Sequence, residues 1–181
     1  PYTTLFRSGA IDVAREKVEK EGYVTLDQFG NSHNPQMHYY TTGPEIYNDT
    51  KGKVTHFVSA MGTTGTIMGV SKYLKEQNDK IQIIGAQPAD GAKIPGIRKW
   101  PDAYLPKIFN RSKVDQIFEV NETEAKLMAR RLAKEEGVFS GMSSGGAVST
   151  ALKVISGLNE GVVVCIICDR GDRYLSTDLF E

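Results

Sequence analysis

The chain has 181 residues, of which 40% are hydrophobic and 24% charged, and these proportions are ordinary for a globular protein. Lys and Arg together number 22, as do Asp and Glu, so the net charge is zero and no basic patch favours nucleic acid or an anionic membrane as partner. The longest apolar run, residues 162–168, is far too short to span a membrane, and no signal peptide is visible.

Both ends of the sequence look cut. Residues 1–9 are interpreted as an adapter-derived scar, because Pro1-Tyr2-Thr3-Thr4-Leu5-Phe6-Arg7-Ser8 matches the translation of a common sequencing adapter. The last residues, 178–181, stop without a finished element.

The N-terminal third predicts two helices with a strand and a loop between them. Residues 10–21 carry apolar side chains on one helical face, and a glycine at position 22 ends that helix. Residues 23–26 predict a short strand, and residues 28–35 a loop or domain crossover. Residues 37–50 predict a helix bent near Gly43-Pro44.

A candidate phosphate site follows the next strand. Residues 54–60 form an apolar run typical of a buried strand, and a turn of Gly62, Thr63, Thr64, Gly65 and Thr66 leads into a helix. The first turn of a helix leaves N–H groups unpaired and positively polarised, and the threonine hydroxyls add donors. The alternative is a plain strand-to-helix turn.

The spacing of the glycines narrows the choice of ligand. Glycines at 62, 65 and 69, with no following Gly-Lys pair, fit neither the nucleoside-triphosphate loop nor the dinucleotide fingerprint. A short cradle without lysine suits a single monophosphate. Pyridoxal phosphate is one such cofactor, and a sugar phosphate meets the same physical requirements.

The second half of the chain continues the alternation. Residues 81–86 and 114–120 predict strands separated by a long, proline-rich loop at 89–110. Asn121 and Glu124 form a capping-box pattern for a helix whose predicted buried face is Ala125, Met128, Ala129 and Leu132, and which ends at Gly137. Another helix opens at 143–146, with Val148, Ala151, Leu152 and Ile155 predicted to be buried.

The two cysteines lie in the last predicted strand, residues 162–168. Because positions i and i+3 of a strand face opposite sides, Cys165 and Cys168 are not expected to form a disulfide or share a metal. Two free thiols suit a reducing cytoplasm.

Strands alternating with helices predict an α/β fold with a doubly wound parallel sheet. Ligands of such sheets gather at the carboxyl ends of the strands. Polar residues follow the predicted strands at 62–66, at Gln87 and at Cys168-Asp169, and Ser143 precedes a helix.

Several long motifs resemble one family. They are Ser59-Ala60-Met61-Gly62-Thr63-Thr64-Gly65-Thr66, Ile94-Pro95-Gly96-Ile97-Arg98-Lys99-Trp100, Gly141-Met142-Ser143-Ser144-Gly145-Gly146-Ala147 and Ile166-Ile167-Cys168-Asp169-Arg170-Gly171-Asp172-Arg173-Tyr174. In this order they are similar to cysteine synthase B, the second form of O-acetylserine sulfhydrylase, among the fold-type II pyridoxal phosphate enzymes. The resemblance runs from about residue 10 to the end.

The resemblance implies roles for individual residues. The turn at 62–66 would hold the phosphate of pyridoxal 5′-phosphate, and Ser143 would hydrogen-bond the pyridine nitrogen. Arg98, Cys168 and Asp169 would make the substrate pocket polar, and Gln28 would lie near the substrate carboxylate. The alternatives are a helix cap for Ser143, a solvated loop residue for Arg98, a packed small hydrophobe for Cys168 and a loop hydrogen bond for Gln28.

The resemblance also implies an activity, a division into domains and the lack of the catalytic lysine. The complete enzyme would exchange the acetate of O-acetylserine for sulfide or thiosulfate, as a cytoplasmic homodimer. Residues 10–30 would be the remnant of an N-terminal small domain, and residues 31–181 a C-terminally truncated large domain. The family's Schiff-base lysine lies upstream of residue 10, and none of the 14 lysines occupies a matching motif, so this chain is expected to be inactive.

Two alternatives remain open at this stage. One is another fold-type II enzyme, such as a cystathionine β-synthase or a threonine dehydratase-like protein. The other is a non-catalytic phosphate-binding module that never carried the lysine.

Overall fold

A four-stranded parallel sheet organises the molecule. The computed structural model describes residues 7–181, so most of the segment interpreted as an adapter scar lies outside the described residues. The strands are β1 (His56–Ala60), β2 (Gln82–Pro88), β3 (Gln116–Val120) and β4 (Val163–Cys165). Their spatial order is β3-β2-β1-β4, and every neighbouring pair is parallel. In the register, Val58 pairs with Ile84 on one side and with Cys165 on the other.

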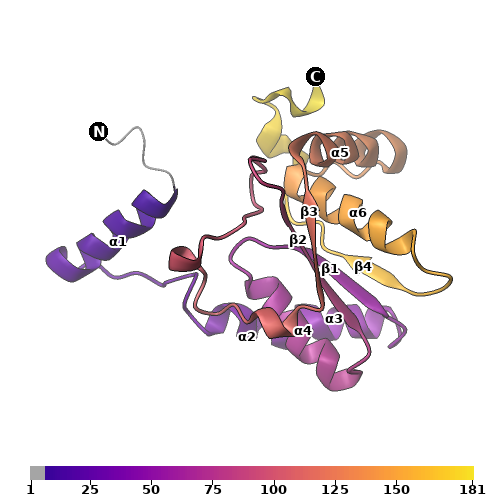
Figure 1. The fold of residues 1–181 in the computed structure, drawn as a ribbon, viewed down its shortest axis with the longest axis horizontal. Helices are drawn as coiled ribbons and strands as arrows, with labels where there is room; N and C mark the ends of the chain where they lie inside the picture. The colour runs from indigo at the N-terminus through magenta and orange to yellow at the C-terminus, as the bar shows by residue number, and fades with distance from the viewer. Residues whose placement is uncertain (1–6) are drawn as a thin grey trace.

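Helices cover both faces of this sheet, as Figure 1 shows. The helices are α1 (Arg7–Glu21), α2 (His33–Tyr40), α3 (Thr42–Asp49), α4 (Gly65–Gln77), α5 (Glu122–Glu136) and α6 (Met142–Ile155). Helix α4 connects β1 to β2 on one face, with α2 and α3 packed outside it, and α5 and α6 connect β3 to β4 on the other. The doubly wound parallel sheet is therefore confirmed, and its strand order reverses between β1 and β4.

The core lies on both faces of β1. Phe57 points toward α4, where it joins Val70, Leu74 and Ile83 in one buried cluster. Val58 points the other way into a cluster with Ala151 of α6. Burying side chains of this size contributes about 1.5–3 kcal/mol each, so β1 is fixed from both sides.

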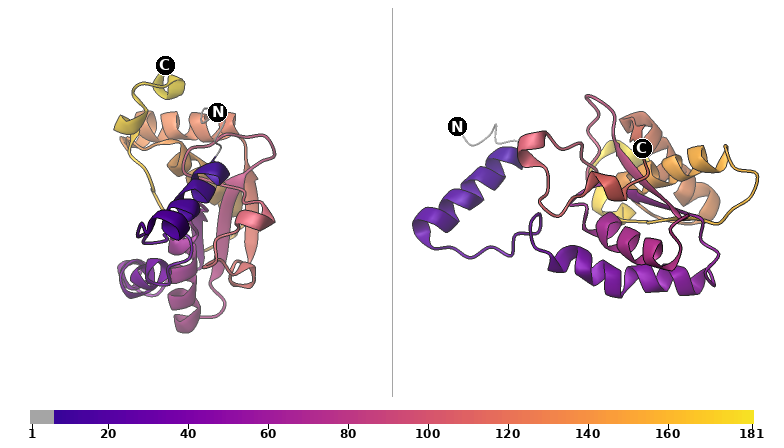
Figure 2. Two further views of the ribbon diagram at one scale, coloured as in Figure 1. Left: turned by 90° about the vertical axis from the view of Figure 1, so that its left-hand side faces the viewer. Right: turned by 60° about the horizontal axis from the view of Figure 1, so that its bottom comes forward.

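The segment before the sheet differs from the prediction. Residues 23–26 form no strand, and the side chains of Val24 and Leu26 are 91% and 84% exposed. A strand needs a partner for its backbone groups, and this segment runs alone between α1 and the sheet domain (Figure 2). The helix predicted at 37–50 is broken at Thr41, earlier than Gly43-Pro44, because Pro44 lies in the first turn of α3, where no N–H is needed.

The capping of α5 is as predicted. The Asn121 side chain accepts a hydrogen bond from the Glu124 N–H at 2.8 Å, and Gly137 ends the helix at φ 69°. Ala125 and Ala129 are fully buried, whereas Met128 and Leu132 are half-buried.

The buried face predicted for α6 was only partly right, since Ala151 is buried and Val148 is half-buried. Leu152 and Ile155 are 42% and 46% exposed, and the buried side is made of small residues, such as Ser144, Ala147 and Thr150. Small side chains allow α6 to pack closely, since a Cβ at Gly145 would lie 2.1 Å from the Ala125 carbonyl oxygen.

Strand β4 is shorter than the predicted 162–168. Cys165 and Cys168 are both free thiols, as expected, and desolvation raises the pKa of Cys165 to about 12. Within residues 7–181 there is no group of three metal-binding side chains, and no helix is long and apolar enough to cross a membrane.

Candidate functional site

The turn after β1 holds a buried hydroxyl with nothing to bond. Thr64 adopts the left-handed conformation at φ 72° and caps α4, and only 5% of it is exposed. Its Oγ1 has no hydrogen-bond partner among the described residues. The N–H groups of Gly62, Thr63 and Thr64 likewise make no hydrogen bond within residues 7–181. A buried donor left unpaired is costly, so the Thr64 hydroxyl favours an acceptor-rich ligand at this turn.

Asn34, from α2, lies directly behind this turn. A Cβ at Gly65 would lie 1.8 Å from Asn34 Oδ1, so the glycine makes room for the asparagine. The Asn34 amide donates to the Gln28 carbonyl oxygen at 2.8 Å and to Thr63 Oγ1 at 3.4 Å. The crossover segment that carries Gln28 is thereby tied to the candidate phosphate turn.

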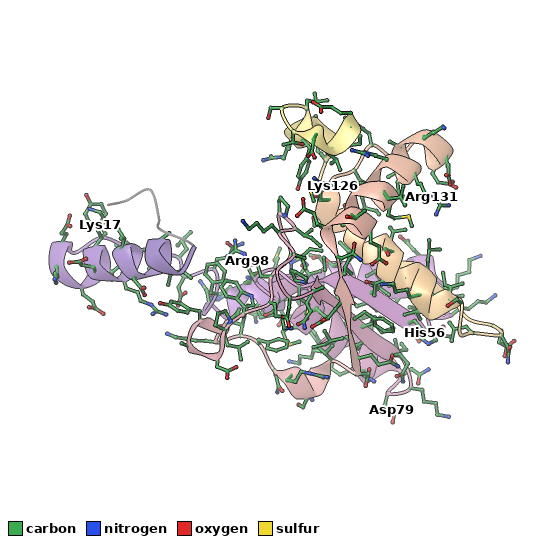
Figure 3. All side chains as sticks on the ribbon, turned by 45° about the horizontal axis from the view of Figure 1, so that its top comes forward. Lys17, His56, Asp79, Arg98, Lys126 and Arg131 are labelled. Carbon is green, nitrogen blue, oxygen red and sulfur yellow. The ribbon has the colours of Figure 1, made fainter. Side chains whose placement is uncertain are left out.

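The long, proline-rich loop at 89–110 contacts this turn through Arg98 and Trp100. The Arg98 N–H donates to the Met61 carbonyl oxygen at 2.8 Å, and Trp100 Nε1 donates to the Gly62 carbonyl oxygen at 2.7 Å. The Arg98 guanidinium lies 5.0 Å from the Trp100 ring centroid and 6.0 Å from that of Phe29. Arg98 is thus held beside the end of β1, and Figure 3 labels it between α1 and the sheet.

The first turn of α6 meets the same loop. Gly96 has φ 89°, and a Cβ on it would lie 3.0 Å from Ser143 Oγ. Ser143 is 3% exposed and lies in the first turn, while Gly141 is the capping residue, so the capping alternative for Ser143 is wrong. A Cβ at Gly62 would lie 2.8 Å from the Gly96 carbonyl oxygen, so the candidate phosphate turn and Ser143 both lie against Gly96.

Asp169 supplies the side-chain cap that Gly141 cannot. Its Oδ1 accepts from the N–H groups of Gly141 (3.2 Å) and Ser144 (3.0 Å) and from Ser144 Oγ (2.5 Å). Its Oδ2 accepts from the Ser143 N–H at 3.2 Å and the Tyr174 hydroxyl at 2.7 Å. Asp169 thus binds the start of α6 from the segment after β4.

These contacts set the charge state of the group. Burial alone would raise the pKa of Asp169, but hydrogen bonds from Ser144, Tyr174 and Ser143 outweigh it and hold the pKa below its usual value. Desolvation, followed by the hydrogen bond to Asp169, raises the pKa of Tyr174. Desolvation also raises the pKa of the Cys168 thiol, although the residue is exposed overall. Asp169 therefore stays ionised at neutral pH between neutral neighbours.

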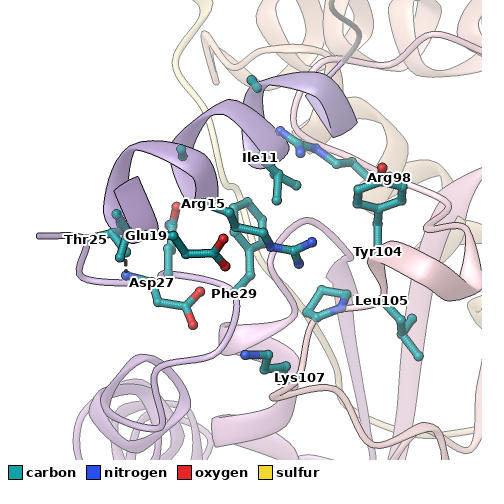
Figure 4. A pocket seen from close by; sticks show the side chains of 15 residues that line it. Ile11, Arg15, Glu19, Thr25, Asp27, Phe29, Arg98, Tyr104, Leu105 and Lys107 are labelled. Carbon is teal, nitrogen blue, oxygen red and sulfur yellow. Dashed lines mark hydrogen bonds between the residues drawn. The ribbon is translucent and has the colours of Figure 1, made fainter. Parts of the chain in front are cut away.

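A cleft of about 530 Å³ opens between α1 and the loop at 98–107. Gln28 is one of its lining residues. Arg98, Ile11, Arg15 and Tyr104 also line it, as Figure 4 shows. Cys168 and Asp169 are not among its lining residues. The predicted pocket residues therefore form two groups, one in this cleft and one at the start of α6.

One residue beside the candidate phosphate turn, His38, is not marked by any sequence pattern as part of a site. His38 of α2 reaches Thr66 Oγ1 with its Nε2 at 3.2 Å. Neither metal-ligand spacing nor a helical stripe marks this histidine in the sequence, and only its spacing of four from Thr42 hints at a contact.

Comparison with known proteins decides the family. Residues 6–169 match the family described as "Pyridoxal-phosphate dependent enzyme". The chain belongs to this pyridoxal phosphate family. Cysteine synthase B of Pseudomonas aeruginosa is 56% identical over 174 residues, covering 96% of this chain and 58% of that relative.

Solved structures extend the agreement to the fold. The cysteine synthase of Entamoeba histolytica matches with a TM-score of 0.86 at 36% identity, over 96% of this chain and 54% of that one. The O-acetylserine dependent cystathionine β-synthase of Helicobacter pylori matches with a TM-score of 0.84 at 34% identity, over 96% and 60%. The chain thus spans little more than half the length of these relatives, and both the resemblance and the cofactor predicted from sequence are confirmed.

The turn after β1 fits the phosphate of pyridoxal phosphate. The Thr64 hydroxyl, which has no partner among the described residues, lies at the start of α4, where a dianion is favoured electrostatically. The turn lies where the strand order reverses, the usual ligand position of a doubly wound sheet.

Proposed function

We propose that this chain forms the cofactor-holding part of a pyridoxal phosphate-dependent cysteine synthase. The observation that carries the proposal is the buried, unpartnered Thr64 hydroxyl in the turn that ends β1. The 56% identity to a cysteine synthase B supports the choice within the family. In this proposal residues 10–30 are the tail of a smaller domain, and residues 31–181 belong to the larger one.

In this proposal, different residues bind the phosphate and the ring of the cofactor. Gly62, Thr63, Thr64, Gly65 and Thr66 hold the phosphate with N–H and hydroxyl donors. Ser143, fixed in the first turn of α6, offers its hydroxyl to the pyridine nitrogen. When bound, the cofactor supplies an electron sink for β-replacement. A hydroxyl does not hold a proton on that nitrogen as a carboxylate would, so the site favours elimination and replacement over transamination.

The substrate side draws on both groups of pocket residues. Arg98 and Gln28 face the cleft below α1, where a guanidinium suits the carboxylate of O-acetylserine or an anionic second substrate such as thiosulfate. Cys168 lies beside Ser143 and adds a small polar group. Asp169 holds Ser143 in place by accepting hydrogen bonds from the backbone at the start of α6. The complete protein, as a cytoplasmic homodimer, would make cysteine from sulfide or S-sulfocysteine from thiosulfate.

The chain by itself is proposed to bind the cofactor without catalysis, because no lysine in it matches the Schiff-base motif. The test incubates the purified chain with pyridoxal phosphate, reduces it with borohydride and maps the labelled peptides. We expect weak, scattered labelling and no cysteine from O-acetylserine and sulfide. Stoichiometric labelling of one lysine, with turnover, would contradict the proposal.

A second candidate is an O-acetylserine dependent cystathionine β-synthase, which the match to the Helicobacter pylori enzyme favours. It differs only in the nucleophile that replaces acetate. Product analysis of the gene's complete product, with O-acetylserine and sulfide, thiosulfate or homocysteine, separates the two.

A further inference from the structure

His38 joins two threonine hydroxyls through its two ring nitrogens. Its Nδ1 lies 2.9 Å from Thr42 Oγ1, and its Nε2 lies 3.2 Å from Thr66 Oγ1. The ring is half-buried, between the start of α3 and the first turn of α4. A continuous row of hydrogen-bonding groups thus ends at Thr66, one of the proposed phosphate ligands.

Close packing of α2 on α4 places the ring there. A Cβ at Gly69 would lie 2.1 Å from the Pro35 carbonyl oxygen and 2.7 Å from His38 Cβ, so any larger residue would push the helices apart. Thr66 and Gly69 are three residues apart and share one face of α4. The glycine that allows the contact therefore also brings His38 against Thr66.

The position of the ring proton decides what Thr66 can do. A neutral imidazole has one N–H donor and one acceptor nitrogen, and desolvation lowers the pKa of His38, which favours this neutral form. If Nε2 carries the proton, it donates to Thr66 Oγ1, and the Thr66 hydroxyl proton is free to point away from the ring. If Nδ1 carries the ring proton, Nε2 accepts a hydrogen bond from the Thr66 hydroxyl. Thr66 then presents only lone pairs to a phosphate.

We propose that His38 is a positioning residue of the phosphate site: its Nε2–H holds Thr66 so that the threonine hydroxyl donates to the phosphate, while Nδ1 accepts from Thr42. The inference rests on the proposed function, because it takes the turn at 62–66 as the phosphate site. It adds to that site a residue from α2 that touches no part of the cofactor itself.

The first test compares binding of pyridoxine 5′-phosphate and pyridoxine to the full chain by calorimetry. Neither carries an aldehyde, so neither reacts with the 14 lysines. Replacing His38→Leu should weaken the phosphate ester about fivefold, the usual effect of one lost hydrogen bond, and leave pyridoxine unchanged. His38→Gln, whose amide can donate to Thr66, should stay within about twofold of the original chain.

The matched background is Thr66→Val, which removes the hydroxyl on which His38 acts. There His38→Leu should have no further effect, since residues acting through one contact are not additive. Equal loss in both backgrounds would overturn the inference, as would unchanged phosphate preference in His38→Leu. If the original chain bound both compounds equally, the phosphate site itself would be refuted, and this inference with it.

The second test locates the ring proton of His38 directly. It uses the original chain, so it does not depend on whether the variants fold. The chain has three histidines, so nitrogen NMR of histidine-labelled protein with pyridoxine 5′-phosphate bound can assign each ring. We expect His38 to carry its proton on Nε2. A proton on Nδ1 would overturn the inference.

Discussion

The carboxylate that caps α6 offers a sharp perturbation. Replacing Asp169→Asn preserves shape but leaves one acceptor oxygen in place of two. With that oxygen toward Gly141 and Ser144, the new amide group faces the Ser143 N–H, which then has no acceptor. The Tyr174 hydroxyl can turn and accept from the amide, so the damage is concentrated at Ser143.

The size of the effect follows from these contacts. An unsatisfied buried N–H costs about 1–3 kcal/mol, and the lost charge at the start of α6 about 0.3–1 kcal/mol more. We expect Asp169→Asn to lower the free energy of unfolding by about 2–3 kcal/mol, which for a chain of this size is about 4–12 °C in melting temperature.

The pH dependence of stability tests independently whether the ionised form of Asp169 stabilises the fold. The pKa of Asp169 is below its usual value of 3.8 in the folded chain, so its ionised form is bound more tightly than in the unfolded chain. Its stabilisation is full above pH 3.8 and is lost as the pH falls through the lower folded value. The stability gap between the original and Asp169→Asn should therefore be constant from about pH 7 to 5 and narrow in stronger acid.

Urea unfolding followed by circular dichroism measures both effects. The control is Asp172→Asn, in the same segment, whose carboxylate pairs with Arg170 at 3.0 Å on the surface and should matter by less than about 0.5 kcal/mol. If the two variants were equally stable, or if the gap widened in acid, Asp169 would not be the cap of α6.

Two further predictions rest on single contacts. Asn121→Ala removes the cap of α5 and should cost about 1 kcal/mol in urea unfolding, whereas Asn121→Ser, which can accept from the same Glu124 N–H, should cost less than half of that; equal losses would argue against the cap. The pKa of Cys165, raised to about 12, should leave roughly a thousandfold less thiolate at pH 8 than in urea. The more basic thiolate is also the better nucleophile, so alkylation by iodoacetamide, read by peptide mass spectrometry, should be roughly a hundredfold slower in the folded chain. Comparable rates in both conditions would show that the thiol is not desolvated.

Local chemistry made several features readable from the sequence. The apolar run before the Gly/Thr turn predicted β1, and the turn residues themselves supplied the donors that the fold leaves unpartnered. Asn121 and Glu124 predicted the cap of α5 because capping involves residues three apart in one chain segment. Such features depend on neighbours in sequence, so no packing is needed to find them.

Other features depend on what lies across space. The strand predicted at 23–26 has suitable residues but no neighbouring strand to bond. Leu152 and Ile155 suggested the buried side of α6, yet the tight approach of α5 at Gly145 selected the side with small residues. His38 could not be found in sequence, since its place beside Thr66 follows from helix packing at Gly69.

The sequence by itself determined the family and the parallel α/β plan, and it pointed to the turn at 62–66 as the candidate phosphate site, because each of these depends on residues that are contiguous in the chain. Only the tertiary structure decided that Asp169 caps α6 beneath Ser143 and that His38 stands behind Thr66. The physical reason is that a hydrogen bond needs its two atoms within about 3 Å, and residues 25 or more positions apart meet at that distance only once the sheet and its helices have packed.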